Sequence, residues 1–348
     1  MMTREELVAR LGAPLGDLES DRGLFAAAVE VRNRTVGDRV YLRGLIELSN
    51  RCRKDCLYCG IRCGNDRVKR YELTDEEVLT AADQVWRAGY GSVVLQAGEQ
   101  ANEAFAERVE RLVRQIKRLS NGELGITLSL GEQSQETYRR WFEAGAHRYL
   151  LRIESSSPEL YARLHPADHS HAERLACLHR LRAEGYQVGT GVMIGLPFQT
   201  VEHLADDLLF FKALDIDMCG MGPYIEAPGT PLAEVPEAFS RTERLQLALR
   251  MVALLRLLMP DINIASTTAL HALHPRGREL GIGAGANVMM PNRTPQEGRV
   301  NYRLYDNKPM EDMDLRGFAV ALDNRWGDSL HFAARGNEAG ASSETAEG

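Results

Sequence analysis

The sequence predicts an α/β protein whose core is a (β/α)8 barrel of the TIM type, preceded by helices and followed by a disordered tail. Segments typical of strands and of helices alternate along the chain, which favours a parallel sheet. Eight strand-like segments follow one another at intervals of roughly 30 residues, as successive βα units do. The 348-residue chain is also long enough for a barrel of about 250 residues with additions at its ends.

The expected elements follow one another in a regular order. Residues 3–11 and 20–35 are predicted to be helices, so 1–35 is expected to be a helical lead-in. The first strand, 41–50, ends beside a group of cysteines. After it we expect helix 74–89, strand 91–99, helix 102–119, strand 124–132, helix 134–145, strand 147–155, helical residues 157–185, strand 187–197, helix 200–214, strand 218–225, helix 240–259, strand 262–268, a short helix near 275–281 and strand 286–292.

The predicted helices have the apolar periodicity of helices that cover a barrel. In 240–259, Leu245, Leu249, Val252 and Leu255 recur at steps of three and four residues, which places them on one face. We therefore expect the barrel to occupy 36–310, followed by a C-terminal extension over 311–333. Residues 334–348 contain no large apolar side chain, so this tail is expected to be disordered.

The composition is that of an ordinary soluble protein with enough apolar material for a large core. Hydrophobic residues make up 44% of the chain and charged residues 26%. The net charge of −7 predicts no nucleic-acid partner, and the locally basic "DRVKR" is more often a solvated face. No apolar run approaches the ~18–20 residues of a membrane span, so no membrane association is expected. The charged N-terminus lacks an export signal, which favours the cytoplasm.

Three cysteines at the end of the first strand indicate a metal centre. Cys52, Cys56 and Cys59 have the spacing C-x3-C-x2-C. Three thiolates on one loop can hold three irons of a 4Fe–4S cluster, and the fourth iron then lacks a protein ligand. Clusters that only carry electrons are normally held by four cysteines. An open iron therefore predicts a cluster that binds a small molecule and takes part in catalysis.

The other cysteines leave two alternatives open. Cys63 could complete a zinc site with four cysteine ligands, although the spacing fits such a site less well. Disulfides are less favoured, because six cysteines in a chain of this length without an export signal fit a reducing compartment. Cys177 and Cys219 are expected to be small buried apolar side chains. The role of Cys63 stays open.

Charged residues on the fourth strand suggest a binding site inside the barrel. In a regular strand, Arg148, Leu150, Arg152 and Glu154 share one face. If that face points inward, the charges must pair with one another or with a ligand, because burying an unpaired charge is prohibitively costly. A zwitterionic ligand would satisfy both signs at once, and the alternative is a layer of ion pairs.

Other strand ends carry further candidates, because catalytic residues of such barrels collect at the carboxyl ends of the strands. Gln96, Gly98 and Glu99 follow the second strand, where a helix-capping turn is the alternative. Glycines near the ends of the fifth and sixth strands would let a flat ligand approach Met193, Met221 and Ile225. These methionines could equally fill gaps in the core. His271 and His274 are expected to be loop histidines.

The cysteine motif, with Tyr58 before its last cysteine, resembles the signature of the radical S-adenosylmethionine (SAM) superfamily. The resemblance implies that the open iron chelates the amino and carboxylate groups of SAM. An electron from a reducing donor then cleaves SAM to methionine and a 5′-deoxyadenosyl radical. From the strand ends and the family pattern together, the residues expected to bind SAM are Tyr58, Gln96, Gly98, Glu99, Arg152, Glu154, Arg174, Met193, Met221 and Ile225.

Within that superfamily the chain is most similar to the HydE family of FeFe-hydrogenase maturases, over about residues 3–310. The resemblance implies one 4Fe–4S cluster, SAM, and a sulfur-containing iron–cysteine organometallic precursor as substrate, with other hydrogenase maturases as partners. It also implies that Arg148, Thr267, Thr268, Met290 and Tyr302 line the substrate chamber. No cysteine follows Cys219, so the accessory cluster of some family members is not expected. The segments that carry the resemblance include "CRKDCLYCGIR", "VLQAGE", "TLSLGE", "AGAHRYLLRIE", "GPYIEAPGTPLA" and "GANVMMPNRTP".

Two other functions remain as alternatives. Methylornithine synthase, a lysine mutase, shares the cysteine motif and "GANV". A mutase would need acidic groups for a substrate ammonium, and the strand ends offer few besides Glu99 and Glu154. A non-catalytic cluster carrier or scaffold is the second alternative, and the predicted clamp of Arg152 and Glu154 argues against it. Biotin synthase is more remote, since it needs ligands for an auxiliary cluster.

Overall fold

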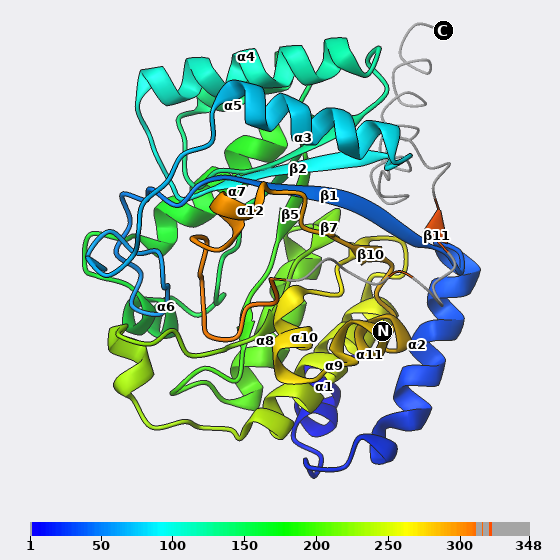
Figure 1. The fold of residues 1–348 in the computed structure, drawn as a ribbon. Coiled ribbons are helices and arrows are strands. Elements are labelled where there is room, and N and C mark those ends of the chain that lie inside the picture. The colour runs from blue at the N-terminus through cyan, green and yellow to red at the C-terminus, as the bar shows by residue number, and fades with distance from the viewer. Residues whose placement is uncertain (1, 311–314, 316–319, 322–348) are drawn as a thin grey trace, which may run out of the picture.

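The computed structural model describes residues 2–310, 315 and 320–321, and within them the chain forms the expected barrel of parallel strands (Figure 1). The strand order is β10-β1-β2-β3-β4-β5-β7-β9. A parallel bridge between Ala265 and Val288 joins the two ends of this path. The barrel strands are β1 (Val40–Ser49), β2 (Ser92–Ala97), β3 (Gly125–Ser129), β4 (Arg148–Leu150), β5 (Gln187–Thr190), β7 (Met218–Cys219), β9 (Asn263–Ile264) and β10 (Val288–Met289).

The two faces of β1 have different surroundings because side chains alternate along a strand. Ile46 and Leu48 are fully buried in the main core cluster. A Cβ added to Gly44 would lie 2.4 Å from a side-chain carbon of Val85, so glycine lets a helix pack closely here. Arg43 and Glu47 lie on the other face, toward the barrel axis, where polar side chains need partners.

Helices surround the barrel, and the longer ones bury apolar side chains against it. They are α3 (Asp75–Arg87), α4 (Glu103–Leu119), α5 (Gln135–Glu143), α6 (Pro158–Leu164), α7 (His171–Ala183), α8 (Val201–Ala213), α9 (Arg241–Leu258), α10 (Thr268–Leu273), α11 (Gly277–Gly283) and α12 (Gln296–Arg299). Capping boxes start α3 (Thr74 with Glu77) and α9 (Ser240 with Glu243), which fixes their first turns. Most of α9 is buried, because the barrel covers one side of this helix and α2 packs against another.

The N-terminal segment forms α1 (Arg4–Leu11), a short 3-10 helix (Leu18–Asp21) and α2 (Arg22–Thr35). Buried Asp21 receives hydrogen bonds from Gln246 (2.7 Å) and Arg250 (2.7 Å) of α9, which tie this segment to the barrel. At the other end, β11 (Val320–Ala321) pairs with the start of β1. The predicted extension 311–333 and tail 334–348 otherwise lie outside the described residues. No helix in the described part is long and apolar enough to span a membrane.

The fifth and sixth predicted strands are each divided in two. After β5 and β7 the chain continues as β6 (Met193–Ile194) and β8 (Gly222–Pro223), which pair with each other in a separate two-stranded sheet. The division falls at Gly191 and Gly220, whose backbones touch. A Cβ on Gly191 would lie 2.3 Å from the carbonyl oxygen of Gly220. This close approach ends the regular pairing and places β6 and β8 at the carboxyl end of the barrel.

The helical residues predicted over 157–185 form two helices, α6 and α7. Two local expectations were wrong. His271 lies in α10, which was not predicted, so only His274 is outside a helix. The fourth strand ends at Leu150, and Glu154 has a positive φ of 66°. Because the backbone leaves the extended conformation there, Arg148 and Glu154 do not share a continuous strand face.

Candidate active site

The three motif cysteines lie on the loop that follows β1, and all three are free and half-buried. The backbone N–H of Glu99 donates to Sγ of Cys52 at 3.3 Å. Such N–H···S contacts are among the interactions that tune cluster thiolates. Burial raises the pKa of the Cys56 thiol to about 12, against the opposing charge of Arg174. A bound metal reverses this preference, because a coordinating thiol is deprotonated.

Among the described residues, no three His, Cys, Asp or Glu side chains lie close enough together to hold one metal ion. The three thiols of Cys52, Cys56 and Cys59 lie on one loop and are free. Thiols are the usual protein ligands of 4Fe–4S clusters, so this donor set is chemically suited to the predicted cluster.

Internal contacts hold the cysteine loop in shape. Arg70 donates to the carbonyl oxygens of Asn50 (2.7 Å), Ile61 (2.7 Å) and Arg62 (2.5 Å). Asp55 accepts from Arg62 in a bidentate pair at 2.7 Å. The turn after β2 packs against the loop, since a Cβ on Gly98 would lie 2.4 Å from the carbonyl oxygen of Arg51. Gly98 is therefore required by a backbone contact, whatever it does for a ligand.

The connection from α6 to α7 supports the other side of the loop. Leu57 donates its N–H to the carbonyl oxygen of Leu164 at 3.0 Å, and Asp55 donates to Nε2 of His169 at 3.0 Å. The Tyr58 hydroxyl lies 3.4 Å from Nε2 of His165. Burial lowers the pKa of His165 to about 3, so this imidazole stays neutral. Each motif cysteine is thus flanked by residues anchored to the barrel.

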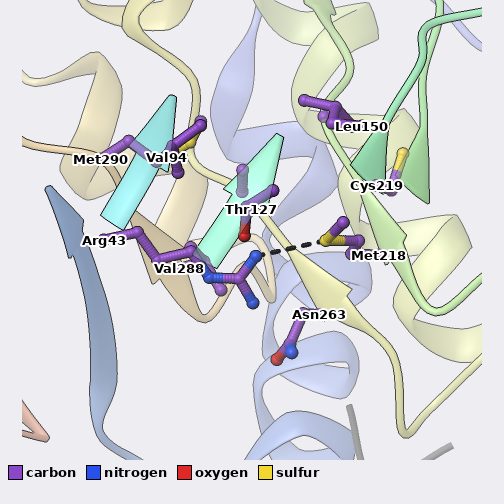
Figure 2. Close-up of a pocket in the computed structure, with 11 residues that line it drawn as sticks. Arg43, Val94, Thr127, Leu150, Met218, Cys219, Asn263, Val288 and Met290 are labelled. Atoms are coloured by element: carbon purple, nitrogen blue, oxygen red, sulfur yellow. Dashed lines mark hydrogen bonds between the residues drawn. The ribbon is translucent and has the colours of Figure 1, made fainter. Parts of the chain in front are cut away.

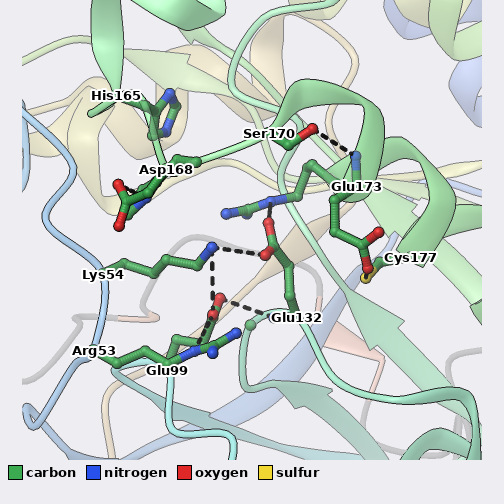
Figure 3. A network of polar contacts seen from close by, with 12 residues as sticks. Arg53, Lys54, Glu99, Glu132, His165, Asp168, Ser170, Glu173 and Cys177 are labelled. Atoms are coloured by element: carbon green, nitrogen blue, oxygen red, sulfur yellow. Dashed lines mark hydrogen bonds and ion pairs between the residues drawn. The ribbon is translucent and has the colours of Figure 1, made fainter.

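A network of charges, most of them buried, joins the cysteine loop to the ends of β2 and β3 and to α7 (Figure 3). Glu132, after β3, accepts from Nζ of Lys54 at 2.7 Å and from Nε of Arg174 at 2.6 Å. Glu99 accepts from Arg53 at 2.9 Å and from the N–H of Glu132 at 2.9 Å. Burial alone would raise the pKa of Glu132, but Arg174 and Lys54 outweigh it and lower that pKa. Glu132 is therefore ionised and holds both cations in place.

The residues predicted to clamp SAM lie on the barrel side of this network. Arg152 and Glu154 form an ion pair at 3.1 Å, and Arg152 also donates to the carbonyl oxygen of Val192 at 2.8 Å. Arg174 donates to the carbonyl oxygen of Arg152 at 3.0 Å. Both Arg174 and Glu154 are near enough to Cys56 to act on the pKa of its thiol. The structure thus brings these three predicted residues together beside the cysteines.

The apolar residues predicted for adenine separate into two groups. Met193 belongs to a small apolar cluster that also contains Leu196 and Tyr224, with Tyr58 packed against it. Met221 belongs to the main core cluster and is only 1% exposed. Ile225 is buried directly after Tyr224. Met193 is therefore the predicted methionine that the structure places beside Tyr58.

A cavity of about 30 Å³, with room for roughly two water molecules, is lined by residues of several barrel strands (Figure 2). Figure 2 shows the Arg43 guanidinium extending toward Met218 and Asn263, and it donates to Sδ of Met218 at 3.2 Å. Leu150 and the predicted substrate residue Met290 also line the cavity. Arg148 is fully buried and donates to the hydroxyl of Thr127, another lining residue, at 3.0 Å.

The remaining predicted substrate residues lie at other parts of the interior. Thr267 caps the start of α10, and its Oγ1 is buried without a hydrogen-bond partner among the described residues. That oxygen faces Gly222, where an added Cβ would lie 2.5 Å from it. Thr268 is the first residue of α10. Tyr302 is buried, and its hydroxyl accepts a hydrogen bond from Gln96 at 3.3 Å. Gln96 was predicted to bind SAM and Tyr302 to line the substrate chamber, so the two predicted sites are in contact here.

Sequence reasoning missed several charged residues of the site. Arg43 and Glu47 could have been found, because charges on alternate positions of a buried strand give the same signal as Arg148 and Arg152. Glu47 forms a buried ion pair with Lys308 at 2.5 Å and accepts from Asn292 at 3.0 Å. Lys54 and Glu132 gave no local signal, because their contact joins residues far apart in the chain.

Comparisons with known proteins show which families the chain resembles. Residues 46–211 match the family model of the radical SAM superfamily. The chain is 45% identical to the FeFe-hydrogenase maturase subunit HydE of Thermotoga maritima, over 88% of this chain and 84% of that protein. It is 28% identical to 3-methylornithine synthase of Methanosarcina acetivorans, over 84% of this chain and 80% of that protein. A crystal structure of methylornithine synthase superposes with a TM-score of 0.73 at 26% identity, covering 98% of this chain and 93% of that one.

Proposed function

Because the chain belongs to the radical SAM superfamily and, within it, to the HydE family, we propose that it is a radical SAM maturase that acts on an anionic iron–cysteine precursor. The observation that carries the proposal is the cysteine loop with its attached charge network, in a chain 45% identical to a HydE protein. We further propose that it works in the cytoplasm, where thiols stay reduced.

The cofactors of this superfamily are a 4Fe–4S cluster and SAM, and this chain offers residues suited to both. Cys52, Cys56 and Cys59 would hold the cluster, which supplies the electron for reductive cleavage of SAM to a 5′-deoxyadenosyl radical. The half-buried loop keeps the three thiols close to the barrel interior. Cys63 is exposed and bonded through its backbone to Lys54, so we assign it no ligand role.

We propose that Arg174 and Glu154 bind the opposite charges of SAM. Among the described residues beside the cysteines, three cations, Arg53, Lys54 and Arg174, share two carboxylates, Glu99 and Glu132. An incoming carboxylate would balance this excess of positive charge. Glu154, which is 8% exposed, offers a carboxylate for the ammonium group, with Arg152 supporting it. Gln96, Gly98 and Glu99 would frame the same end of the ligand.

The adenine is proposed to lie against Met193, Tyr58 and Ile225. Met193 and Tyr58 share one apolar cluster, and apolar surface there offers a flat ring a place to bury its faces. Met221 is a weaker candidate, because it packs in the main core.

The substrate is proposed to be anionic and to lie deeper in the barrel. Arg43 and Arg148 are buried in the interior, and the interior carboxylate Glu47 is paired with Lys308. Thr267 supplies a buried hydroxyl oxygen that has no partner within the described chain. Thr268, Met290 and Tyr302 would complete the chamber. A lysine substrate would need a free carboxylate for its ammonium group, so this charge distribution favours the maturase over the lysine mutase.

Two experiments test the proposal together. Anaerobically reconstituted protein should cleave SAM when a chemical reductant is supplied, which a non-catalytic carrier would not do. The gene should also restore hydrogenase activity in a host that lacks its own HydE but retains the other maturases. If hydrogenase activity does not return and lysine is converted to methylornithine, the lysine mutase is the correct function.

A further inference from the structure

The loop that carries the cysteines is strongly basic although the whole chain is acidic. The chain has a net charge of −7, whereas residues 51–70 contain seven basic and two acidic side chains. In Figure 1 this loop projects at the left of the barrel, beside α6 and away from α2. A local excess of positive charge on an acidic protein is a feature that needs a partner or a structural role.

Most of the basic side chains in the loop have structural roles. Lys54 and Arg53 hold Glu132 and Glu99, Arg62 pairs with Asp55, and Arg70 binds backbone carbonyl groups. Arg67 and Lys69 are different. Both are exposed, and neither forms an ion pair within the described part of the chain. Their charges therefore contribute to the surface potential of the loop and not to its folding.

Two segments that flank the loop add further exposed cations, and each cation lies beside an exposed apolar side chain. Arg163 of α6 lies over the ring of Phe198, with its guanidinium carbon 3.2 Å from the ring centre. Arg303 donates to the carbonyl oxygen of Val300 at 2.9 Å. Phe198 (37% exposed) and Val300 (36%) are the exposed large apolar residues of the described chain. Each of these two apolar residues therefore lies near an arginine of a segment that flanks the cysteine loop.

Both flanking segments touch residues adjacent to the proposed cluster ligands. Leu57, which follows Cys56, donates to Leu164, the residue after Arg163. Gly60, which follows Cys59, is so close to the other segment that an added Cβ would lie 2.2 Å from the carbonyl oxygen of Arg303. The exposed basic and apolar side chains therefore surround the outer side of the cysteine loop.

We propose that this surface is the docking site for a small acidic protein that delivers one electron to the cluster. We call it the entry face, and it comprises Arg67, Lys69, Arg163, Phe198, Val300 and Arg303. The inference rests on the proposed function, because reductive SAM cleavage needs an electron from outside the chain. The carrier is oxidised by one electron and the cluster is reduced by one, with no proton or group transferred.

The chemistry of the entry face matches such a partner. Opposite charges steer encounter and orient the partner, which raises the association rate more than the affinity. Arginine and aromatic side chains are the residues most enriched at the energetic centres of interfaces. Electron-transfer contacts are typically small and short-lived. A few cations around two apolar side chains suit that kind of contact.

The test measures reduction of the cluster, not catalysis. Full-length reconstituted protein is mixed by stopped flow with a reduced acidic plant-type 2Fe–2S ferredoxin, a low-potential carrier, and cluster absorbance is followed. We expect the second-order rate constant to fall as salt rises, since screening weakens steering. The double variant R67E/K69E should react at least about tenfold more slowly at low salt. Calorimetric titration of the two proteins should show weaker binding for the same variant.

A matched variant separates this surface from net charge. R34E/R118E makes the same change in charge at exposed positions of α2 and α4, and should lower the rate constant less than threefold. Equal losses in the two variants, or no loss in R67E/K69E, would overturn the proposal. SAM cleavage driven by dithionite should be unchanged in R67E/K69E. If wild-type protein does not cleave SAM with dithionite, the proposed function fails, while the reduction and binding measurements still decide the entry face.

Discussion

At the scale of single residues, the site depends on buried carboxylates that each hold more than one donor. Glu132 binds Lys54 of the cysteine loop and Arg174 of α7 with its two oxygens. Glu99 binds Arg53 and the backbone of Glu132. Each carboxylate therefore fixes the distance between two elements. Removing Glu132 would leave buried Arg174 without its carboxylate partner, which is more costly than the bond itself is worth.

The cysteines allow a direct residue-level prediction. Replacing Cys52, Cys56 or Cys59 by alanine should remove the cluster and abolish SAM cleavage, because each thiolate is expected to hold one iron. Cys63→Ala serves as the matched control, because Cys63 is on the same loop but exposed. It should retain about four irons per chain after reconstitution. Loss of the cluster in Cys63→Ala, measured by iron content and absorbance, would show that the ligand set is wrong.

Asp207 is an isolated buried carboxylate that positions the chain after Glu154. It is fully buried in α8, and Oδ1 accepts from the N–H (2.7 Å) and hydroxyl (2.6 Å) of Ser156. Burial raises its pKa to about 7 from an ordinary value of 3.8, although the bonds from Ser156 oppose the shift. Since the folded protein then binds a proton that the unfolded chain has released, this group loses stabilising effect as pH rises from about 4 to 7.

We therefore expect Asp207→Asn to flatten this pH dependence. The amide oxygen can accept the same two bonds without a charge, so the unfolding free energy should no longer fall by a few kcal/mol between about pH 4 and 7. Denaturant unfolding at several pH values measures this. Asp206→Asn is the control, because Asp206 is adjacent but half-exposed and paired with Arg4. Parallel pH profiles for wild type and Asp207→Asn would contradict the prediction.

At the scale of elements, the segment after α12 closes the site and is anchored at several points. Leu304 accepts from Gly60 of the cysteine loop at 2.8 Å, and Asp306 donates to Glu226 at 2.9 Å. Lys308 donates to Glu47 of β1 at 2.5 Å and to the carbonyl oxygen of Tyr302 at 2.7 Å. Burial raises the pKa of Glu47 even though Lys308 opposes the shift. Lys308 therefore offsets the free-energy cost of burying the Glu47 carboxylate inside the barrel.

Breaking this pair should be strongly destabilising. Lys308→Met leaves Glu47 buried with Asn292 as its remaining side-chain donor, and should lower the unfolding free energy by about 3–5 kcal/mol. The double variant Glu47→Gln/Lys308→Met removes both charges and keeps the acceptor for Asn292, so it should recover more than half of the loss. Denaturant unfolding of the metal-free protein measures both. A double variant that loses as much as Lys308→Met would refute the argument.

At the scale of the whole molecule, ligand binding should stabilise the barrel because the proposed SAM site joins the cysteine loop, α7 and β4. At a SAM concentration of 100 times the dissociation constant, reconstituted protein should gain about 2.7 kcal/mol of stability. Arg174→Ala removes a charge-assisted bond and should weaken SAM binding by about one to two decades. At the same SAM concentration its gain should shrink to between about 0.4 and 1.4 kcal/mol.

The control for this experiment lies on the same helix. Arg180 is partly exposed and pairs with Glu173 at the surface, so Arg180→Ala should keep the full gain. Thermal unfolding with and without SAM, at equal iron content, measures all three proteins. An equal gain in wild type and Arg174→Ala would mean that Arg174 only supports Glu132 and does not touch SAM.

Local sequence signals determined the class of fold and the position of the cysteine site. Alternating strand and helix patterns are local properties, so the barrel and the order of its main elements could be predicted from them. The spacing of Cys52, Cys56 and Cys59 is equally local. The charges on the first strand belong to the same class of signal, and Arg43 and Glu47 could have been predicted from alternation as Arg148 was.

Only the tertiary structure decided how the charges are paired and where the strands end. Glu132 meets Lys54 and Arg174 because the barrel brings the loops after β1 and β3 and the start of α7 to one side, although 78 and 42 residues separate them. The positive φ of Glu154 and the contact between Gly191 and Gly220 come from packing between strands. Pairing energies depend on distances in space, and a sequence pattern records only neighbours along the chain. The barrel and its cysteines could therefore be predicted, whereas the charge network that surrounds them could not.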